Sequence, residues 1–209
     1  MVLNSGDYGG ITYMWNDGSA IAICPKSTDP YPNNFRGVVQ HEAGGHGFGK
    51  LADEYIYVNS FISSCDCSNP HLKEFYAGKA NGWYKNLSEN SDRDAVPWSH
   101  LMYHPTYSNI VDIYEGGFFH TRGIFRSEQN SCMNNNIPYY STISRQAIVE
   151  RIMEYAGLPF NIEEFYANDS LTPGTKAALT SAPTWGAASS NQTNANHHEP
   201  ILMGDRLNL

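Results

Sequence analysis

The chain of 209 residues is 41% hydrophobic, 13% aromatic and 16% charged, and its 21 acidic and 13 basic side chains give a net charge of −8. This length suits one domain with or without an appendage, and the negative charge argues against nucleic acid, which binds a basic face. No apolar run reaches the roughly 18 residues of a membrane span, and the first residues are typical of a strand rather than a signal peptide. The low charged fraction and the many Tyr and Asn residues favour a secreted, cell-surface or periplasmic bacterial protein.

The first fifty residues are predicted to form a small sheet followed by a helix. Apolar segments indicate three strands, at residues 2–5, 11–15 and 20–24. The Asn-Asp-Gly sequence at 16–18, between the last two strands, is a strong hairpin signal. Three prolines make residues 25–34 a loop, and residues 35–49 are predicted to be helical.

The rest of the chain carries fewer regular patterns. Residues 57–137 show no sustained period and are predicted to be mostly irregular; a stretch of this length in a compact domain is usually functional. Residues 144–155 have helical spacing, with Gly157 and Pro159 as end signals, and residues 181–196 are low in complexity. The four cysteines lack the paired spacing of a zinc ribbon, which leaves free thiols or one long-range disulfide as interpretations.

The predicted helix at 35–49 carries the residues of a metal site. His41 and His46 are five positions apart, and Glu42 directly follows the first. Zinc peptidases place two histidines four apart on a helix, so that both face one metal. At about 100° per residue, a spacing of five leaves the side chains about 140° apart on an ideal α-helix, whereas one π-type turn restores a shared face. Glycines at 44, 45 and 47 favour this distortion over a plain polar helix face, because each costs about 1 kcal/mol in a regular helix.

The sequence after this motif resembles a known family. Residues 48–55 read Phe-Gly-Lys-Leu-Ala-Asp-Glu-Tyr. They match the second half of the His-Glu-x-x-His-x-Phe-Gly-x-Leu-Ala-Asp-Glu-Tyr segment of the bacterial metalloendopeptidase family whose founding member cleaves immunoglobulin A. Shorter blocks at residues 3–10, 115–127 and 132–133 resemble other segments of that family. The chain departs from the family at Ser127, where proline is usual, and in the extra residue between the histidines, which resembles the His-Glu-x-x-Gly-His variant of dipeptidyl peptidase III.

The resemblance implies an α+β, metzincin-like zinc peptidase domain over residues 1–170. Such a domain has a small mixed sheet with an edge strand over the active-site helix, an irregular lower half with a Met-turn, and a C-terminal helix. It also has strands and a helix before the strand that residues 2–5 would form, so we expect this sequence to lack them. Residues 171–209 are then expected to be a low-complexity stretch and a tail, or the start of a further module.

The resemblance and the histidine spacing together assign roles at the site. His41 and His46 are expected to bind Zn²⁺, and Glu42 is the expected catalytic general base, which takes a proton from the attacking water. A catalytic zinc keeps one position open and takes three protein ligands, and Asp53 is the expected third. The alternatives for this ligand are Glu54 and His120.

Three further features complete the predicted site. The resemblance implies that Met133 forms the Met-turn beneath the metal. Tyr139 is a candidate for stabilising the oxyanion of the reaction. The strand at 11–15 is expected to be an exposed sheet edge that accepts an extended peptide as an added strand.

These expectations describe a zinc-dependent endopeptidase that acts on extended protein or peptide substrates. The alternatives are a non-catalytic zinc-binding surface module that retains the fold, and an exopeptidase. The presence of Glu42 favours the enzyme over the binding module, and no group that would hold a free terminus is recognised. The resemblance does not imply cleavage of immunoglobulin, because related sites act on different substrates.

Overall fold

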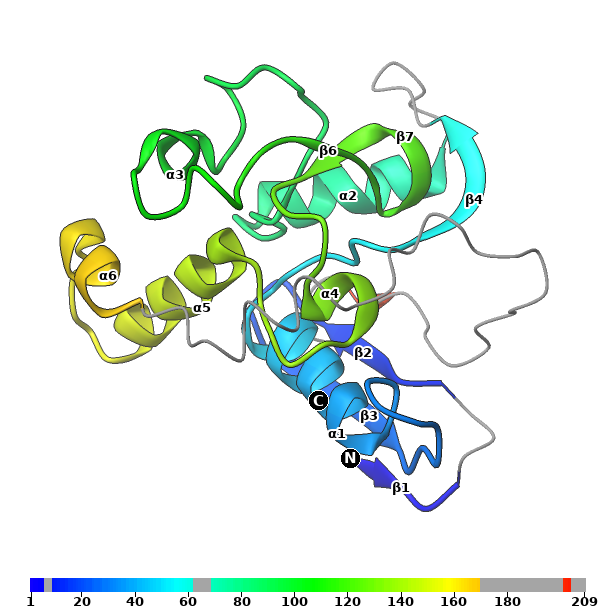
Figure 1. The fold of residues 1–209 in the computed structure, drawn as a ribbon. Coiled ribbons are helices and arrows are strands. Elements are labelled where there is room, and N and C mark those ends of the chain that lie inside the picture. The colour runs from blue at the N-terminus through cyan, green and yellow to red at the C-terminus, as the bar shows by residue number, and fades with distance from the viewer. Residues whose placement is uncertain (6–8, 62–68, 170–200, 204–209) are drawn as a thin grey trace.

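The computed structural model describes residues 1–5, 9–61, 69–169 and 201–203. Within them the fold is mixed α+β with two small sheets, which confirms the predicted α+β class (Figure 1). The low-complexity segment at 181–196 lies outside the described residues. None of the helices in the described ranges is long and apolar enough to cross a membrane.

The first sheet has the strand order β1-β3-β2-β8. Its strands are β1 Val2–Leu3, β2 Ile11–Met14, β3 Ala20–Pro25 and β8 Ile201–Leu202. The antiparallel pairing of β2 with β3 confirms the predicted hairpin, in which Gly18 takes a φ of 83° that glycine adopts without strain.

The prediction that residues 11–15 form an exposed edge is wrong. β8 pairs with β2 in parallel, with Tyr13 opposite Ile201 and Met14 opposite Leu202. The amide of Met203 also donates to the carbonyl of Met14, at 2.7 Å. β2 is therefore not an edge strand at these residues. Its backbone groups pair with a segment almost two hundred residues later in the sequence.

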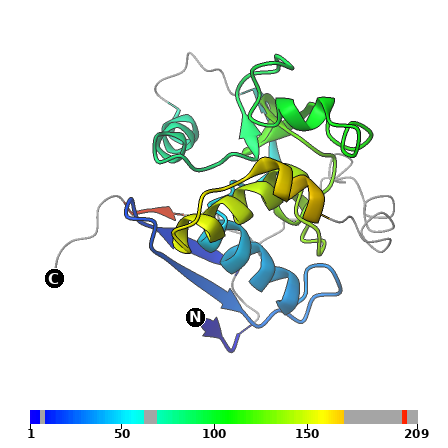
Figure 2. The ribbon, with the colours of Figure 1, turned by 90° about the vertical axis from the view of Figure 1, so that its left-hand side faces the viewer.

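The predicted helix at 35–49 is confirmed as two continuous segments, α1 (Phe35–Val39) and the π-helix η1 (Gln40–Phe48). The side chain of Asn34 caps α1 by accepting a hydrogen bond from the amide of Gly37. Both segments pack against β3, and η1 also packs against β2, so that the helix lies along the first sheet (Figures 1 and 2).

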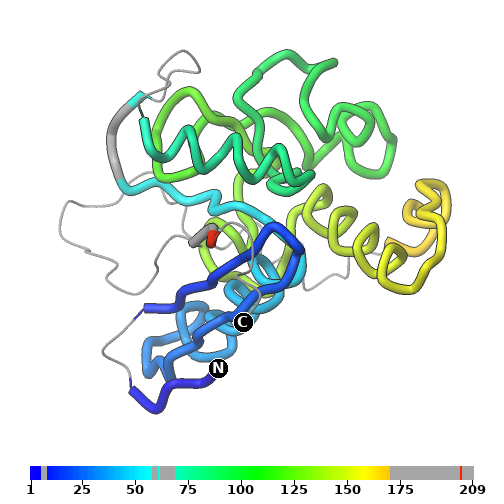
Figure 3. The backbone as a smooth tube through the Cα atoms, turned by 180° about the vertical axis from the view of Figure 1, so that it is seen from behind, coloured from blue at the N-terminus to red at the C-terminus, as the bar shows by residue number. Residues whose placement is uncertain are grey.

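The second sheet has the order β4-β7-β5, with β6 paired to β7. Its strands are β4 Ile56–Phe61, β5 Leu87–Ser88, β6 Tyr114–Gly117 and β7 Phe119–Arg126. The helix α2 (Pro70–Ala80) lies alongside it (Figures 1 and 3). An aromatic core fills the space between them, including Phe75, Tyr84, Leu87, Phe118 and Phe119.

The remaining helices are α3 Ser99–Tyr103, α4 Cys132–Asn135, α5 Thr142–Tyr155 and α6 Ile162–Asn168. A separate core joins α3, α5 and α6, and it includes Trp98, Leu101, Tyr107, Val111, Ile143 and Phe165. The short helix α4 packs instead against η1. The predicted helix at 144–155 is confirmed, although it begins two residues earlier.

The prediction of a mostly irregular stretch at 57–137 is wrong, because this stretch holds α2 and the second sheet. Gly78 lies inside α2, where it would ordinarily weaken a helix. Its missing Cβ makes room for the ring of Tyr84, since a Cβ built there would lie 2.0 Å from the ring. A residue that looks like a helix breaker in the sequence is therefore required by tertiary packing.

The cysteines in the described ranges are buried free thiols, Cys24 and Cys132. Burial raises the pKa of both thiols. No disulfide joins these two residues, so a long-range bridge between them is excluded. Cys65 and Cys67 lie outside the described residues.

Candidate metal centre

Three buried side chains converge on one point. His41 and His46 come from η1, and Asp53 comes from the extended segment that follows it. The two histidine Nε2 atoms lie 3.0 Å apart, and Asp53 Oδ1 lies 2.9 Å from the first and 3.2 Å from the second. Each side chain is at most 1% exposed. In the part of the chain that the structure describes, this is the one group of three or more side chains arranged to share a metal ion.

The π-helix explains how histidines five positions apart share a face. In η1 the hydrogen bonds run from each amide to a carbonyl five residues earlier, as from Gly49 to Gly44, at 2.9 Å. The five-residue spacing predicts a single distorted turn between His41 and His46. The structure confirms the distortion and extends it over nine residues.

The orientation of both imidazoles is fixed by backbone carbonyls. His41 Nδ1 donates to the carbonyl of Cys132 at 3.0 Å, and His46 Nδ1 donates to the carbonyl of Leu51 at 2.7 Å. Because a carbonyl only accepts, each Nδ1 carries a ring hydrogen, so that in the neutral imidazole Nε2 keeps the lone pair that can bind a metal. This is the arrangement that second partners impose on metal-binding histidines. Without a metal, burial disfavours the charged ring of His46, but the Asp53 carboxylate outweighs burial and raises the pKa of His46 to about 9.

The site therefore brings together three atoms that can bind one metal ion, and without a metal the proton on His46 supplies the positive charge beside Asp53. Tetrahedral zinc bonds of roughly 2.0–2.1 Å place ligand atoms about 3.3 Å apart, close to the 2.9–3.2 Å separations here. Asp53 Oδ2 is buried and accepts no hydrogen bond from any described residue. Burial disfavours charge on Asp53, but His46 and His41 hold the pKa of its carboxyl well below the usual range. The three side chains fit a bound metal ion.

Glu42 is held beside this cluster by the first sheet. Thr12 of β2 donates its hydroxyl hydrogen to Glu42, with Oε2 at 2.7 Å and the main-chain carbonyl oxygen at 3.0 Å. Both residues are fully buried. Gly10 packs directly on the carboxylate, because a Cβ at this position would lie 2.6 Å from Glu42 Oε1. The strand thus fixes the position of the predicted general base.

Met133 lies against η1, where the resemblance expects the Met-turn. A Cβ on Gly45 would lie 2.2 Å from Met133 Sδ, so only glycine allows this close approach. Met133 is fully buried with Leu51 and Ala147, and its carbonyl accepts a hydrogen bond from the amide of Glu54, at 2.8 Å. It thereby packs beneath the helix that carries both histidines.

The two alternative ligands have other partners. Glu54 accepts hydrogen bonds from Asn86 and Ser131, and burial raises its pKa to about 7. His120 of β7 lies with its Nε2 2.9 Å from His71 Nδ1, and burial lowers its pKa. Neither side chain belongs to the metal-ligand cluster, so Asp53 is the carboxylate that the structure brings to the histidines.

The structure does not bring Tyr139 to the cluster. Its hydroxyl donates to Glu128 Oε2 at 2.7 Å, and the Arg145 guanidinium lies 5.0 Å from the centre of its ring. With its hydroxyl hydrogen committed to a buried carboxylate, Tyr139 supports the loop before α5 and has no donor left for an oxyanion.

Sequence reasoning missed the groups that orient the site. Thr12 lies in the strand at 11–15 that the sequence assigns to substrate binding, and its hydroxyl instead contacts Glu42. The carbonyls of Leu51 and Cys132 position the histidines. Every residue has a backbone carbonyl, so the sequence does not indicate which carbonyls accept these hydrogen bonds. The sequence of β2 does give one indication: the alternation of its side chains places Thr12 on the buried face, and a buried threonine hydroxyl needs a hydrogen-bond partner.

No protein-family model matches this chain, and comparison with curated proteins finds no match either. The family resemblance therefore stays a prediction based on the motif.

Proposed function

We propose that this chain is a zinc-dependent endopeptidase. The observation that carries the proposal is the convergence of His41 Nε2, His46 Nε2 and Asp53 Oδ1 within 3.2 Å, with Glu42 adjacent on the same helix. Two imidazoles and a carboxylate are the donor set of catalytic zinc in many hydrolases. Zinc bound there supplies a Lewis acid that polarises a peptide carbonyl.

The protein's own residues perform the proton transfers in this proposal. Glu42 accepts a proton from the attacking water and delivers it to the leaving amine as the peptide bond breaks. The hydrogen bond from Thr12 holds one carboxylate oxygen in place, which limits the side chain to one working orientation. The full burial of Glu42 strengthens its electrostatic interaction with charge that develops nearby.

The proposal is tested by metal analysis together with cleavage of a quenched fluorescent peptide library. We expect about one zinc per chain and measurable cleavage by the wild-type protein. Glu42→Gln should retain zinc and lose activity by about 10²–10⁴-fold, the usual contribution of a general base. His46→Ala should lose the zinc, whereas the control His100→Ala, which changes an exposed histidine bonded to Gln146, should retain it.

Two results would contradict the proposal. Full activity of Glu42→Gln would remove the assigned general base. Stoichiometric zinc without cleavage of any peptide in the library would instead support the non-catalytic zinc-binding module.

A further inference from the structure

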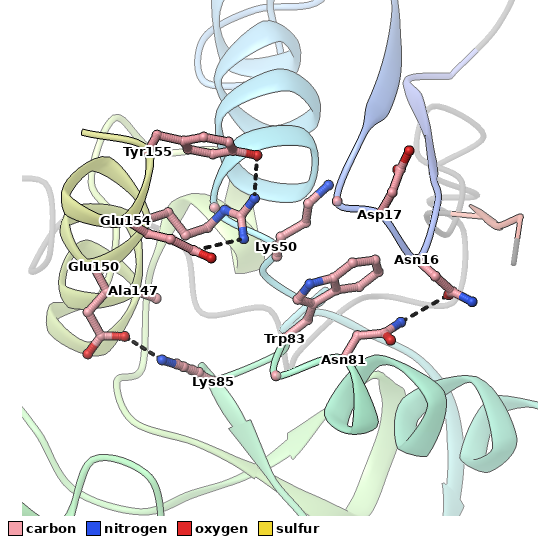
Figure 4. A pocket seen from close by; sticks show the side chains of 14 residues that line it. Asn16, Asp17, Lys50, Asn81, Trp83, Lys85, Ala147, Glu150, Glu154 and Tyr155 are labelled. Carbon is pink, nitrogen blue, oxygen red and sulfur yellow. Dashed lines mark hydrogen bonds and ion pairs between the residues drawn. The ribbon is translucent and has the colours of Figure 1, made fainter. Parts of the chain in front are cut away.

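A cavity lies at the C-terminal end of η1. It is enclosed by the β2–β3 hairpin, the end of α2 and the exposed side of α5 (Figure 4). Its volume is about 670 Å³, which is within the range of small-molecule sites. Neither Glu42 nor any residue of the metal-ligand cluster lines this cavity, so the cavity and the metal site are distinct.

Lys50 lines this cavity. It follows Gly49 at the end of η1 with a positive φ of 54°, and its carbonyl is fixed by the amide of Tyr84 at 2.9 Å. The residue is only 2% exposed, and its Nζ lies 5.0 Å from the centre of the Trp83 ring. Among the described residues this Nζ has no hydrogen-bond acceptor, although a buried lysine is normally paired.

The other cations of the cavity have acidic partners. Lys85 forms an ion pair with Glu150. Arg151 lies 4.0 Å from a carboxylate oxygen of Glu154 and donates to the hydroxyl of Tyr155 at 3.0 Å (Figure 4). Lys50, a lining residue with a buried Nζ, is therefore the cavity cation that has no carboxylate in ion-pair contact in the described part of the chain.

The electrostatic environment of Lys50 favours an added anion. Burial, and then the nearby charge of Arg151, lower the pKa of Lys50 to about 8, and Asp17 acts in the opposite direction. Asp17 Oδ1 itself accepts hydrogen bonds from the amide and the hydroxyl of Ser19. An anionic group beside Lys50 would supply the acceptors that its ammonium lacks and would offset the repulsion from Arg151.

We propose that this cavity binds a small organic carboxylate with a polar, ring-sized body, of which a sugar acid is the simplest form. The carboxylate pairs with Lys50. The body lies against Trp83 and beside Asn16 and Asn81, whose amides are joined at 3.1 Å on the opposite rim (Figure 4). Polar side chains from both rims suit hydroxyl groups, and the indole gives them an apolar surface to rest on.

The experiment is calorimetric titration of the zinc-loaded full chain at pH 7, where Lys50 carries its charge. D-glucuronate is the probe, D-glucose is its uncharged counterpart, and inorganic phosphate represents a different anion. We expect saturable binding of glucuronate at least tenfold tighter than binding of glucose or phosphate. Lys50→Met should weaken glucuronate binding at least tenfold. The control Lys85→Met removes a cation of the same cavity that is already paired, and should leave binding within twofold of wild type.

The proposal is overturned if glucuronate does not bind, if glucose or phosphate binds as tightly, or if Lys50→Met binds like wild type. Should Lys50→Met fail to fold, acetylation of the wild-type protein by an N-hydroxysuccinimide ester decides the question. Mass spectrometry should show that glucuronate slows acetylation of Lys50 at least threefold and leaves that of Lys85 unchanged. An unchanged acetylation rate at Lys50 overturns the proposal. None of these measurements depends on peptide cleavage, so the proposed function can fail independently.

Discussion

Asp53 and Glu54 are neighbours in the sequence and are both fully buried, yet their carboxylates serve two different sites. Asp53 Oδ1 lies beside the Nε2 atoms of two imidazoles, and no described residue donates to Oδ2. The two oxygens of Glu54 instead accept hydrogen bonds, one from Asn86 Nδ2 and the other from Ser131 Oγ. Burial is therefore no guide to function here, whereas the chemistry of the partners is.

The pKa values of the two carboxyls are shifted in opposite directions. Two histidines outweigh burial at Asp53 and hold its pKa below the usual range. At Glu54, burial outweighs the hydrogen bonds from Ser131 and Asn86, and the pKa rises to about 7. Asp53 therefore lies beside groups that can carry a positive charge or bind a metal ion, while Glu54 lies among neutral donors that stabilise the fold.

The largest expected effect comes from removing charge at each carboxyl in turn. Asp53→Asn should lose zinc, because an amide is a weaker zinc ligand than a carboxylate and only the two histidines remain as strong ligands. The rate of peptide cleavage should then fall by more than about 100-fold. Glu54→Gln should keep about one zinc per chain, since its side chain binds Asn86 and Ser131. Metal analysis after dialysis against a weak chelator measures both outcomes.

The reverse result would break the comparison. If Glu54→Gln lost zinc and Asp53→Asn kept it, then Glu54 would be the third ligand in solution and the cluster would have to rearrange. Equal loss in both variants would show that the two carboxyls act as one unit.

The next effect concerns stability. Glu54→Ala leaves the buried donors of Asn86 and Ser131 without an acceptor, and we expect it to lower the free energy of unfolding by about 1–3 kcal/mol. Urea denaturation of the zinc-loaded protein measures this change. The control Glu89→Ala removes an exposed carboxylate and should stay within about 0.5 kcal/mol of wild type. A loss no larger than that of the control would mean that Glu54 does not stabilise the fold.

The motif predicted this site better than the surrounding fold. The clustering of His41, His46 and Asp53 could be predicted because helical spacing and ligand chemistry constrain one another within fifteen residues. The choice of Asp53 over Glu54 was less constrained, because it depends on Asn86 and Ser131, which the sequence places more than thirty residues away.

The fold was predicted where contacts are local and missed where they are not. The β2–β3 hairpin and the helices near residues 35–49 and 144–155 rest on turn signals and local periods. The parallel pairing of β4 with β7 joins segments about sixty residues apart, and the pairing of β8 with β2 joins the two ends of the chain. No local pattern encodes such partners.

A third prediction tests the packing that holds the histidines. Gly45→Ala places a Cβ 2.2 Å from Met133 Sδ, and this overpacking should cost about 1–3 kcal/mol. The melting temperature should fall by roughly 2–4 °C per kcal/mol in a chain of this size. Gly47→Ala is the matched variant, because its nearest contact is 3.3 Å away, and its loss should be smaller. A Gly45→Ala protein as stable as wild type would mean that Met133 moves aside freely.

The smallest expected effect concerns the access of a substrate to the metal-ligand cluster. The Glu54 site needs no such access. A peptide substrate that adds to β2 as a strand must use the backbone groups of Tyr13 and Met14, which pair with β8. These groups lie one and two residues beyond Thr12, which holds Glu42. If a peptide substrate adds to β2 in this way, it has to displace the segment at 201–203.

Deletion of residues 200–209 should accordingly lower the KM for peptide cleavage, by a factor of about three to ten, and leave kcat and zinc content unchanged. This range of KM values corresponds to a free energy of roughly 1 kcal/mol for the pairing of β8 with β2 that the substrate has to displace. Met203→Ala is the control, because it removes a half-exposed side chain while its amide still donates to Met14, and its KM should match wild type. An unchanged or higher KM in the deletion variant would show that substrate does not use this edge, and the cluster would then have to be reached along another side of η1.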